Sequence, residues 1–543
     1  MSTEITQAAT GAATIRNPVL RGFYPDPSIL RVGEDYYLAT STFEWYPGVT
    51  VHHSRDLVHW RPLGGLLNER RLLDLRGSTD SCGVWAPDLS YVDGLFYLVY
   101  SDVSSFSNGY WDPQNYLITA PDITGPWSDP VPLHAHGFDA SLFHDDDGSS
   151  WLLSMSADWR PGRNRFGGIE IQRFDRERRQ LVGDPVVIFT GTEAGYTEAP
   201  HIYRHNGWYY LMTAEGGTSW NHQITVARSR SLFGPYEPDP NGPMLTSVGH
   251  PELTLQKAGH GSLVCTQTGQ WYVAHLVGRP YTPFGKCVLG RETAIQAVTW
   301  SPDGWPRVAG GIPAEEVPAP DLPLHPWPTP PEVDDFEGTE LRPEWSSLRR
   351  PVTPDWATLT ERPSHLRIYG GQSPVGRQRP SLVARRVSAP RCVLETVMEF
   401  RPTSFRQLAG VTGYYNVNNW HFLYVTRADD GRRVLSVLSC DQGQRRPYPE
   451  VEVDVSHVER VGLRVTFDGP QLRFGYDLGD GWRELPLELD ATILSDEHAA
   501  RIVPGEPELW GFTGAMVGLW VQDIGADGVY ADFDYAAYRE LEN

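Results

Sequence analysis

One short phrase recurs five times along the N-terminal half of this chain. In each copy an acidic residue or a histidine starts a short apolar strand, and a turn joins that strand to an aromatic-rich one. The copies begin 62, 51, 59 and 62 residues apart, and the starting residues are Asp26, Asp88, Asp139, Glu198 and His260. A near-constant, strand-rich period of about 50–60 residues suits a four-stranded propeller blade. The sequence therefore predicts an all-β fold that begins with a five-bladed β-propeller.

These five starting residues are the first candidates for chemistry. The first strand of each blade lines the propeller axis, so five blades aim five side chains at one funnel. Two unit charges about 6 Å apart repel by roughly 3 kcal/mol at an effective dielectric constant of about 20, or about two pKa units. One carboxyl of such a set therefore tends to keep its proton while its partners ionise. Glycosidic hydrolysis needs that division, because an acid protonates the leaving oxygen while a base activates water or attacks the sugar. The alternative is that these residues cap turns or pair with arginine.

A proline-rich segment divides the chain. Eight prolines fall between Pro313 and Pro331, where they exclude helix and central strand and favour a semi-rigid spacer. Alternating strands and Asp-Gly turns follow without the blade repeat, which predicts one β-sandwich. The last strands of the fifth blade are expected to close against the N-terminal strand. The expected organisation is a disordered leader over 1–15, the propeller over 16–312, the linker over 313–333 and the sandwich over 334–543.

Composition bears on partners and compartment. The net charge of −22 argues against nucleic acid or an anionic membrane as a partner. No run approaches the roughly 18 apolar residues of a membrane span, and the first residues lack the basic and apolar regions of a signal peptide. The five cysteines are scattered without metal-ligand spacing, which favours reduced thiols over disulfides. These features predict a cytoplasmic protein that requires no cofactor.

Five motifs, in their order along the chain, resemble those of family 43 glycoside hydrolases. They are Tyr24-Pro25-Asp26-Pro27-Ser28, Trp85-Ala86-Pro87-Asp88, Phe138-Asp139-Ala140-Ser141-Leu142-Phe143, Thr197-Glu198-Ala199-Pro200-His201 and Gly290-Arg291-Glu292-Thr293. Two further phrases, Lys257 to Leu263 and Gly511 to Ala515, resemble the intracellular β-xylosidase branch, which carries a concanavalin-like C-terminal sandwich. The resemblance covers nearly the whole chain. One departure is Ala140, where a proline is common, and it leaves the carboxylate of Asp139 unchanged.

This resemblance implies a five-bladed propeller that hydrolyses glycosides with inversion of the anomeric configuration, and it assigns roles to individual carboxylates. Asp26 is implied to be the general base that activates water, and Glu198 the general acid. Asp139 is implied to orient Glu198 and to raise its pKa. Asp88 has no catalytic role in the family, so a structural role is expected for it.

The remaining implied roles concern the sugar. Arg291 is expected to bind sugar hydroxyls with its fixed fork of donors, and Trp85 and Phe43 to wall the subsite of the terminal sugar. Phe512 is expected to reach from the sandwich and close the pocket. His260 lies near the central pore in the family, which makes it a candidate for substrate contact or for a Ca²⁺ ion in the pore. A hydrogen-bonded core histidine is the alternative.

The implied function is an inverting exo-β-D-xylosidase that releases xylose from the non-reducing end of small β-1,4-linked xylo-oligosaccharides. Activity on α-L-arabinofuranosides, instead of or beside it, is one alternative. A retaining fructosidase-type propeller is another, with Asp26 as nucleophile and carboxyls about 5 Å apart in place of about 6.5–9.5 Å. A third is a non-catalytic sugar-binding propeller, which would tolerate loss of an axial carboxylate. The sandwich is either a lid on the pocket or a separate binding module, and a homodimer or tetramer is the family's habit.

Overall fold

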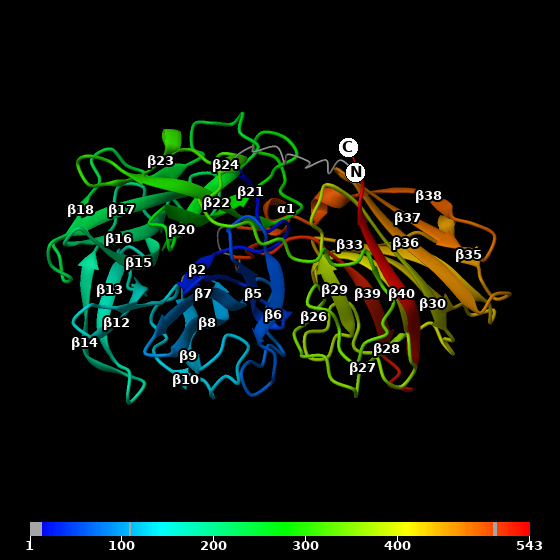
Figure 1. Cartoon of the computed structure of the whole chain (residues 1–543). Coiled ribbons are helices and arrows are strands. Elements are labelled where there is room, and N and C mark those ends of the chain that lie inside the picture. The colour runs from blue at the N-terminus through cyan, green and yellow to red at the C-terminus, as the bar shows by residue number, and fades with distance from the viewer. Residues whose placement is uncertain (1–12, 108–109, 503–507, 543) are drawn as a thin grey trace, which may run out of the picture.

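Two domains lie side by side in the computed structural model, which describes residues 13–107, 110–502 and 508–542 (Figure 1). The N-terminal domain is a β-propeller and the C-terminal domain is a β-sandwich, so the predicted all-β fold is confirmed. Helical structure in these residues is confined to α1 (Asp496–Ala499) and the 3-10 turns η1 (Ala309–Gly311), η2 (Pro449–Val451) and η3 (Ala491–Ile493). None of these described helices has the length and apolar character needed to cross a membrane.

Five antiparallel sheets form the propeller blades in the described residues. The first strands of neighbouring blades pack against one another in a closed ring around the axis, as the repeat predicted. The strands are β2 (Ser28–Val32), β3 (Asp35–Thr40), β5 (Gly48–Ser54) and β6 (Arg61–Leu67) in blade one; β7 (Gly83–Val92), β8 (Leu95–Ser107), β9 (Tyr110–Ala120) and β10 (Val131–Pro132) in blade two; β11 (Ser141–His144), β12 (Ser150–Ala157), β13 (Phe166–Asp175) and β14 (Gln180–Phe189) in blade three; β15 (Glu198–His205), β16 (Trp208–Glu215), β17 (Gln223–Ser229), β18 (Glu237–Pro238) and β19 (Leu245–Thr246) in blade four; and β20 (Gln256–Cys265), β21 (Trp271–Gly278), β22 (Arg291–Trp300) and β23 (Pro306–Val308) in blade five.

The N-terminal strand lies outside the blades. β1 (Thr14–Arg16) pairs antiparallel with β24 (Glu316–Pro318), so the start of the predicted linker is tied to the propeller. Blade five takes its described strands from residues 256–308, and the N-terminal segment adds one bridge from Leu20 to β22. The expected contact of blade five with the N-terminal segment is made by this bridge and by the backbone N–H of Tyr24, which donates to the Arg291 carbonyl at 3.0 Å. Strand β1 itself pairs with β24 instead, and Ile15 is buried beside it. Of the predicted leader, residues 1–12 lie outside the described residues.

The sandwich consists of two antiparallel sheets that enclose one apolar core. One sheet has the order β27 (Ala357–Thr358), β28 (Leu366–Tyr369), β40 (Tyr530–Glu540), β30 (Arg391–Phe400), β36 (Arg460–Asp468), β37 (Gln471–Asp477) and β38 (Arg483–Asp490), with β25 (Val333–Asp334) beside β40. The other has the order β34 (Gln444–Pro447), β33 (Arg433–Asp441), β32 (Asn419–Arg427), β31 (Gln407–Asn416), β39 (Met516–Asp523), β29 (Leu382–Arg386), β26 (Ser346–Leu348) and β4 (Trp45–Tyr46), with β35 (Val453–Asp454) beside β33.

The two domains share a sheet and a core. Strand β4 belongs to the propeller segment of the chain, yet it pairs with β26 of the sandwich through Trp45 and Tyr46. One cluster of buried side chains includes Phe43 and Trp85 of the propeller together with Trp420 and Trp520 of the sandwich. Because burial of large aromatic side chains dominates packing energetics, the sandwich is an integral part of the propeller's surroundings.

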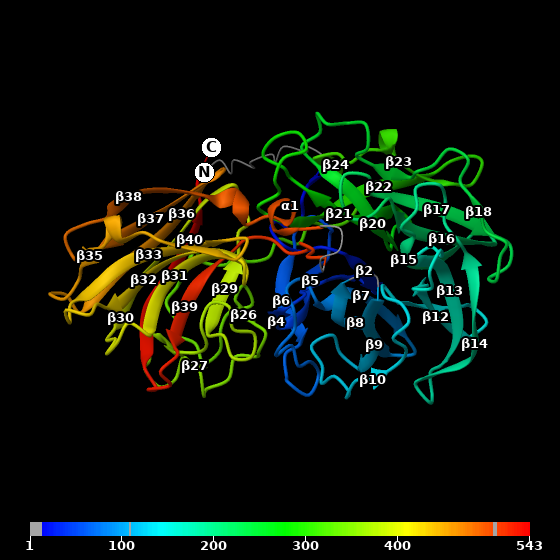
Figure 2. The ribbon, with the colours of Figure 1, turned by 180° about the vertical axis from the view of Figure 1, so that it is seen from behind.

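Helix α1 of the sandwich lies between the two domains (Figure 2). The sequence contains two lysines, Lys257 and Lys286, and both contact this helix. The Lys257 ammonium pairs with Glu497, and Glu497 also accepts a hydrogen bond from the backbone N–H of Cys287 at 2.9 Å. Lys286 Nζ lies 2.6 Å from Nδ1 of His498. Blade five thus holds the sandwich through charged contacts close to Arg291.

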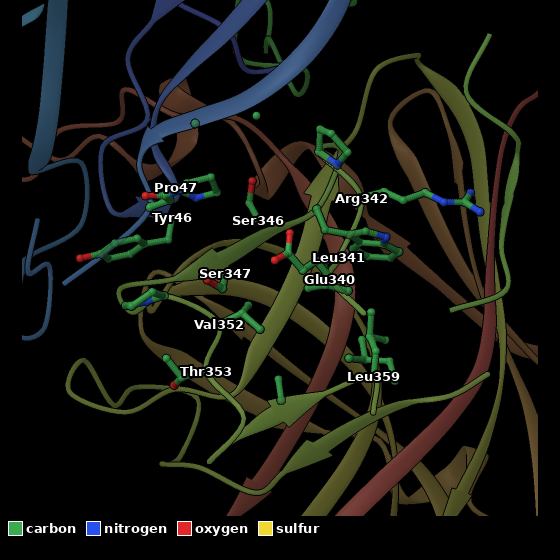
Figure 3. Close-up of a pocket in the computed structure, with 18 of the residues that line it drawn as sticks. Tyr46, Pro47, Glu340, Leu341, Arg342, Ser346, Ser347, Val352, Thr353 and Leu359 are labelled. Carbon is green, nitrogen blue, oxygen red and sulfur yellow. The ribbon is translucent and has the colours of Figure 1, made fainter. Parts of the chain in front are cut away.

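A cavity of about 570 Å³ opens between blade one and the sandwich (Figure 3). Its walls come from Tyr46 and Pro47 on one side and from the segment around Ser346 and Thr353 on the other. Glu340 is the only carboxylate among its described lining residues. The cavity therefore lacks the pair of carboxyl groups that glycosidic hydrolysis uses.

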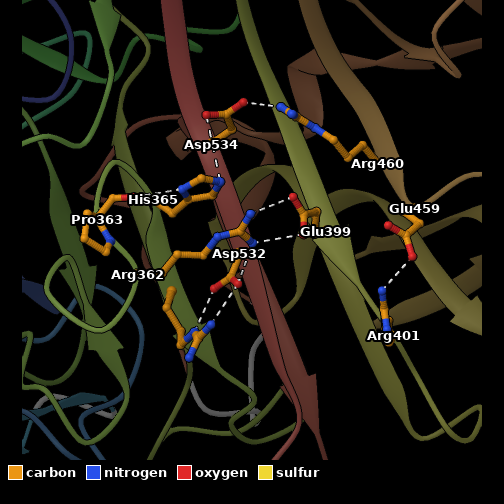
Figure 4. A network of polar contacts seen from close by, with 10 residues as sticks. Arg362, Pro363, His365, Glu399, Arg401, Glu459, Arg460, Asp532 and Asp534 are labelled. Carbon is orange, nitrogen blue, oxygen red and sulfur yellow. Dashed lines mark hydrogen bonds and ion pairs between the residues drawn. The ribbon is translucent and has the colours of Figure 1, made fainter.

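The outward face of the β40 sheet carries a network of ion pairs (Figure 4). Arg362 and Arg367 both donate to Asp532, at 2.9 and 2.8 Å, and Arg362 also binds Glu399 at 2.8 Å. Burial opposes ionisation of Asp532, but the hydrogen bonds from the two arginines lower its pKa. Such a network stabilises the sheet fully at pH values above the ordinary pKa of aspartate, and the stabilisation is lost as pH falls through the lowered pKa of Asp532.

Candidate active site

The backbone departs from the extended conformation at each axial side chain, just before the first strand in blades one and three and at a register shift within it in blades four and five. Asp26, Asp139 and His260 have φ values of 56°, 55° and 49°, in the left-handed region that non-glycine residues rarely adopt. In blade four the left-handed residue is Ala199, with φ of 50°, immediately after Glu198. Strained backbone of this kind persists where the surrounding structure fixes it. Here it directs the four side chains into a common cavity above the strands.

Asp88 does not lie at the same level along the axis as these four residues. It lies inside β7, where it pairs with Val99, and it is level with Ser28 of blade one. Ser28 Oγ donates to Asp88 at 3.2 Å, and Asp88 accepts the backbone N–H of Leu142 at 2.8 Å. The expectation that all five starting residues converge is therefore wrong for Asp88, since it sits lower on the axis and joins neighbouring blades. Its expected structural role agrees with these contacts.

Polar side chains also meet around the axis at the level of Asp88, which bears on the expected metal in the pore. Blade-to-blade hydrogen bonds at this level involve Ser262, Ser28 and Asp88, and His201 faces Asp88 at 3.7 Å. Ca²⁺ takes about six to eight oxygen ligands, carboxylates among them. The described residues contain no group of three or more His, Cys, Asp or Glu side chains arranged to hold a metal. These side chains do not by themselves fit a calcium site, and an ion near His260 stays a prediction.

All eight residues predicted for the site line one cavity of about 660 Å³. The propeller supplies seven of them, and the sandwich supplies one. They are Asp26, Phe43, Trp85, Asp139, Glu198, His260, Arg291 and Phe512. Glu198 is the most exposed of the three carboxylates, whereas Asp26 and Asp139 are buried.

Asp26 is held by a cation and a hydroxyl. Arg291 Nη1 donates to Oδ1 of Asp26 at 3.1 Å, and Ser41 Oγ donates to Oδ2 at 2.7 Å. Arg291 is 4% exposed, and its guanidinium also donates to Thr218 Oγ1 at 2.9 Å. The two donors, Arg291 and Ser41, fix the orientation of the Asp26 carboxyl group at the cavity.

The other two carboxyl groups form a pair whose surroundings favour one bound proton between them, because burial and their mutual repulsion oppose the ionisation of both. Burial raises the pKa of Asp139 well above its ordinary value, and the charge of Asp26 adds to the rise while Arg291 opposes it. Burial likewise raises the pKa of Glu198 well above its ordinary value, with further contributions from Asp139 and Asp26. Since titratable groups with divergent environments mark acid and base roles, Glu198 is suited to hold a proton opposite Asp26.

His260 lies beside Asp26 at the base of the cavity. Its Nδ1 is 3.7 Å from Oδ1 of Asp26. Burial lowers the pKa of His260 to about 4, against the attraction of Asp26. The imidazole is therefore neutral near pH 7, when it offers one donor and one acceptor to a bound sugar or water.

Aromatic rings form the wall, and the sandwich completes it. Phe512 lies 5.9 Å from Phe43 and 5.4 Å from Trp85 between ring centroids. Its carbonyl oxygen accepts hydrogen bonds from Arg291 Nη2 at 3.0 Å and Nε at 3.3 Å. The backbone of Gly290 approaches Thr513 so closely that a Cβ at Gly290 would lie 2.3 Å from its carbonyl oxygen. The phrase around Phe512 is thus docked directly on the residue that precedes Arg291.

Several lining residues were not anticipated from the sequence. Thr218 follows the glycine pair after β16 and accepts a hydrogen bond from Arg291. Behind the lining, Ser41 follows β3 and donates a hydrogen bond to Asp26. An outer aromatic group stacks toward the mouth, with Phe106 and Trp111 4.7 Å apart and Trp510 5.8 Å from Phe512. Trp510 directly precedes the phrase Gly511 to Ala515 that the sequence marks, whereas the other residues are recognised only from the three-dimensional structure.

A model of the glycosyl hydrolases family 43 matches residues 15–306. The chain belongs to glycosyl hydrolases family 43. A second model, the beta-xylosidase C-terminal concanavalin A-like domain, matches residues 333–539. Members of family 43 invert the anomeric configuration, which sets aside the retaining fructosidase-type alternative.

Relatives of the family 43 chain align with almost its whole length. It is 44% identical over 541 residues to a xylan 1,3-beta-xylosidase of Vibrio sp, covering 97% of this chain and 99% of that protein. It is 44% identical over 546 residues to the xylosidase/arabinosidase 43B of Humicola insolens, covering 97% and 98%. The crystal structure of a xylan beta-1,4-xylosidase from Bacillus halodurans C-125 superposes with a TM-score of 0.94 at 46% identity, covering 97% of this chain and 100% of that one.

Proposed function

We propose that this protein is an inverting exo-β-D-xylosidase that removes terminal D-xylose from the non-reducing end of β-1,4-linked xylo-oligosaccharides. The observation that carries the proposal is the cavity in which Asp26, Asp139 and Glu198 meet under the aromatic lid of Phe512. A non-catalytic sugar-binding propeller has no need for this set. Full-length similarity to xylosidases supports the choice of sugar.

The reaction divides between two carboxyl groups. The protonated carboxyl of Glu198 donates its proton to the glycosidic oxygen as the bond from that oxygen to the anomeric carbon breaks. The carboxylate of Asp26 takes a proton from water, whose oxygen bonds to the anomeric carbon from the opposite face. Asp139 helps Glu198 to keep its proton, since its charge raises the pKa of Glu198. Each turnover leaves Asp26 protonated and Glu198 ionised, and proton exchange with solvent restores both.

The sandwich acts as a lid in this proposal. Its Phe512 closes one side of the cavity, and its carbonyl anchors Arg291. A polysaccharide cannot cross a pocket that is walled in this way, so the chain end enters and one sugar leaves at a time. Removal of the sandwich would expose Phe43 and Trp85 and free Arg291, which is unlike the loss of an independent binding module.

A second activity is favoured by one observation. A relative with 44% identity is named a xylosidase/arabinosidase. The α-L-arabinofuranoside presents its hydroxyl groups much as xylose does, so the same Arg291 and aromatic wall can receive it.

We infer a cytoplasmic site of action from the five free thiols, which suit a reducing compartment.

The proposed function is tested with purified protein and xylotriose. The expected products are xylose and xylobiose first, and xylose alone at the end. When the xylotriose is labelled at its reducing end, the label should appear first in xylobiose and only later in xylose. Turnover of 4-nitrophenyl β-D-xyloside is expected to exceed that of 4-nitrophenyl α-L-arabinofuranoside. Release of the labelled end first, or no release of xylose, would refute an exo-acting xylosidase.

A further inference from the structure

Ser81 lies behind the cavity wall and holds two wall residues at once. It precedes β7, is 2% exposed, and is absent from the residues that line the cavity. Its Oγ accepts the backbone N–H of Phe512 at 3.1 Å, and its carbonyl oxygen accepts the indole N–H of Trp85 at 3.0 Å. A ring from the propeller and a ring from the sandwich are thus fixed by a single residue.

Ser81 is in turn fixed by a buried carboxylate. Its backbone N–H donates to Oε2 of Glu44 at 3.1 Å. Glu44 follows Phe43, a third wall residue, whose backbone bridges Val84. The φ of Ser81 is 60°, so this residue is kept in a left-handed conformation by its contacts.

Two arginines of the sandwich clamp the loop that ends in Ser81. We call residues Gly77–Ser81 the clamp loop. Arg349 donates to the carbonyl of Ser78 and to Oδ1 of Asp80, both at 2.7 Å, and its side chain is fully buried. Arg377 donates to Oδ2 of Asp80 at 2.9 Å. The sandwich therefore contacts the clamp loop twice, through Arg349 and Arg377 at Ser78 and Asp80 and through Phe512 at Ser81.

The contacts form a continuous path to the reacting groups. The N–H of Phe512 donates to Ser81, its carbonyl oxygen accepts from Arg291, and Arg291 donates to Asp26 at 3.1 Å. We propose that Ser81 is a positioning residue, which sets the wall of the sugar subsite by holding Trp85 and Phe512 in place. This inference rests on the proposed function, because it assigns Ser81 to the wall of that subsite.

The test is the Ser81→Gly variant. Glycine adopts φ of 60° without strain, so the variant keeps the backbone and removes the hydroxyl that accepts from Phe512. A buried N–H that loses its acceptor is costly. We expect KM for 4-nitrophenyl β-D-xyloside to rise on the order of tenfold, with a smaller change in kcat. The melting temperature should change little, because relief of the left-handed strain at residue 81 offsets the lost hydrogen bond. Hydrogen exchange at the Phe512 amide should become faster.

The matched control is Ser364→Gly. Ser364 has φ of 59° and is exposed in the sandwich, so the same exchange of residue types should leave KM and exchange at Phe512 unchanged. A Ser81→Gly variant with KM within twofold of wild type and an unchanged Phe512 exchange rate would overturn the proposal. If the wild-type protein cleaves no β-xyloside, the proposed function fails, while the exchange rate at Phe512 still decides whether Ser81 holds this loop.

Discussion

Replacement of Glu198 with alanine is expected to abolish almost all hydrolysis of xylobiose and to spare substrates with good leaving groups. General acid catalysis contributes about 10²–10⁴-fold to the rate, so kcat on xylobiose should decrease by about that factor. The 2,4-dinitrophenolate ion leaves without a proton, so the loss on 2,4-dinitrophenyl β-D-xyloside should be much smaller. Steady-state kinetics on both substrates make the measurement. Glu193→Ala, at an exposed carboxylate in the loop that precedes β15, serves as the control.

Equal losses of kcat on both substrates in Glu198→Ala would contradict the role of Glu198 as the acid.

The same role governs the basic limb of the pH profile of kcat/KM. Glu198 must be protonated, so kcat/KM falls as pH rises through its raised pKa. Asp139→Asn removes a charge that raises this pKa, and the basic limb should therefore move to lower pH. A limb that stays in place or moves to higher pH would show that Asp139 does not act on Glu198.

Replacement of Asp26 with asparagine is expected to lower kcat by about 10²–10⁴-fold on both substrates. Asparagine keeps the shape of the side chain but cannot take a proton from water, and attack by water is needed whatever the leaving group. Independence from the leaving group is therefore the signature that separates Asp26 from Glu198. Turnover of 2,4-dinitrophenyl β-D-xyloside within a few-fold of wild type would exclude Asp26 as the base.

Much of the site could be predicted because its residues belong to local phrases. The repeat placed Asp26, Asp139, Glu198 and His260 on an axis, and the family's motifs supplied Arg291 and Phe512. The two-residue offset of Asp88 escaped detection because the spacing of the copies itself varies between 51 and 62 residues. Because the spacing varies this much, it cannot show whether a residue lies at the level of the cavity or deeper along the axis.

Other features depend on contacts between distant parts of the chain. Ser81 and Phe512 are separated by 431 residues, and no local pattern links them. The two-residue strand β4 is too short to be recognised by alternation, yet it joins the propeller to the sandwich sheet. The role of the sandwich as part of the pocket followed from the family resemblance alone, and the backbone contact between Phe512 and Arg291 gives it a physical basis.

The central claim is that water attacks the anomeric carbon from the face opposite the leaving group, with Asp26 as base and Glu198 as acid. Proton NMR of the first-formed sugar, recorded during rapid hydrolysis of 4-nitrophenyl β-D-xyloside and before mutarotation, tests it most directly. The account predicts that α-D-xylose appears first and that the β anomer grows in later. Appearance of β-D-xylose first would show retention of configuration and would contradict the account.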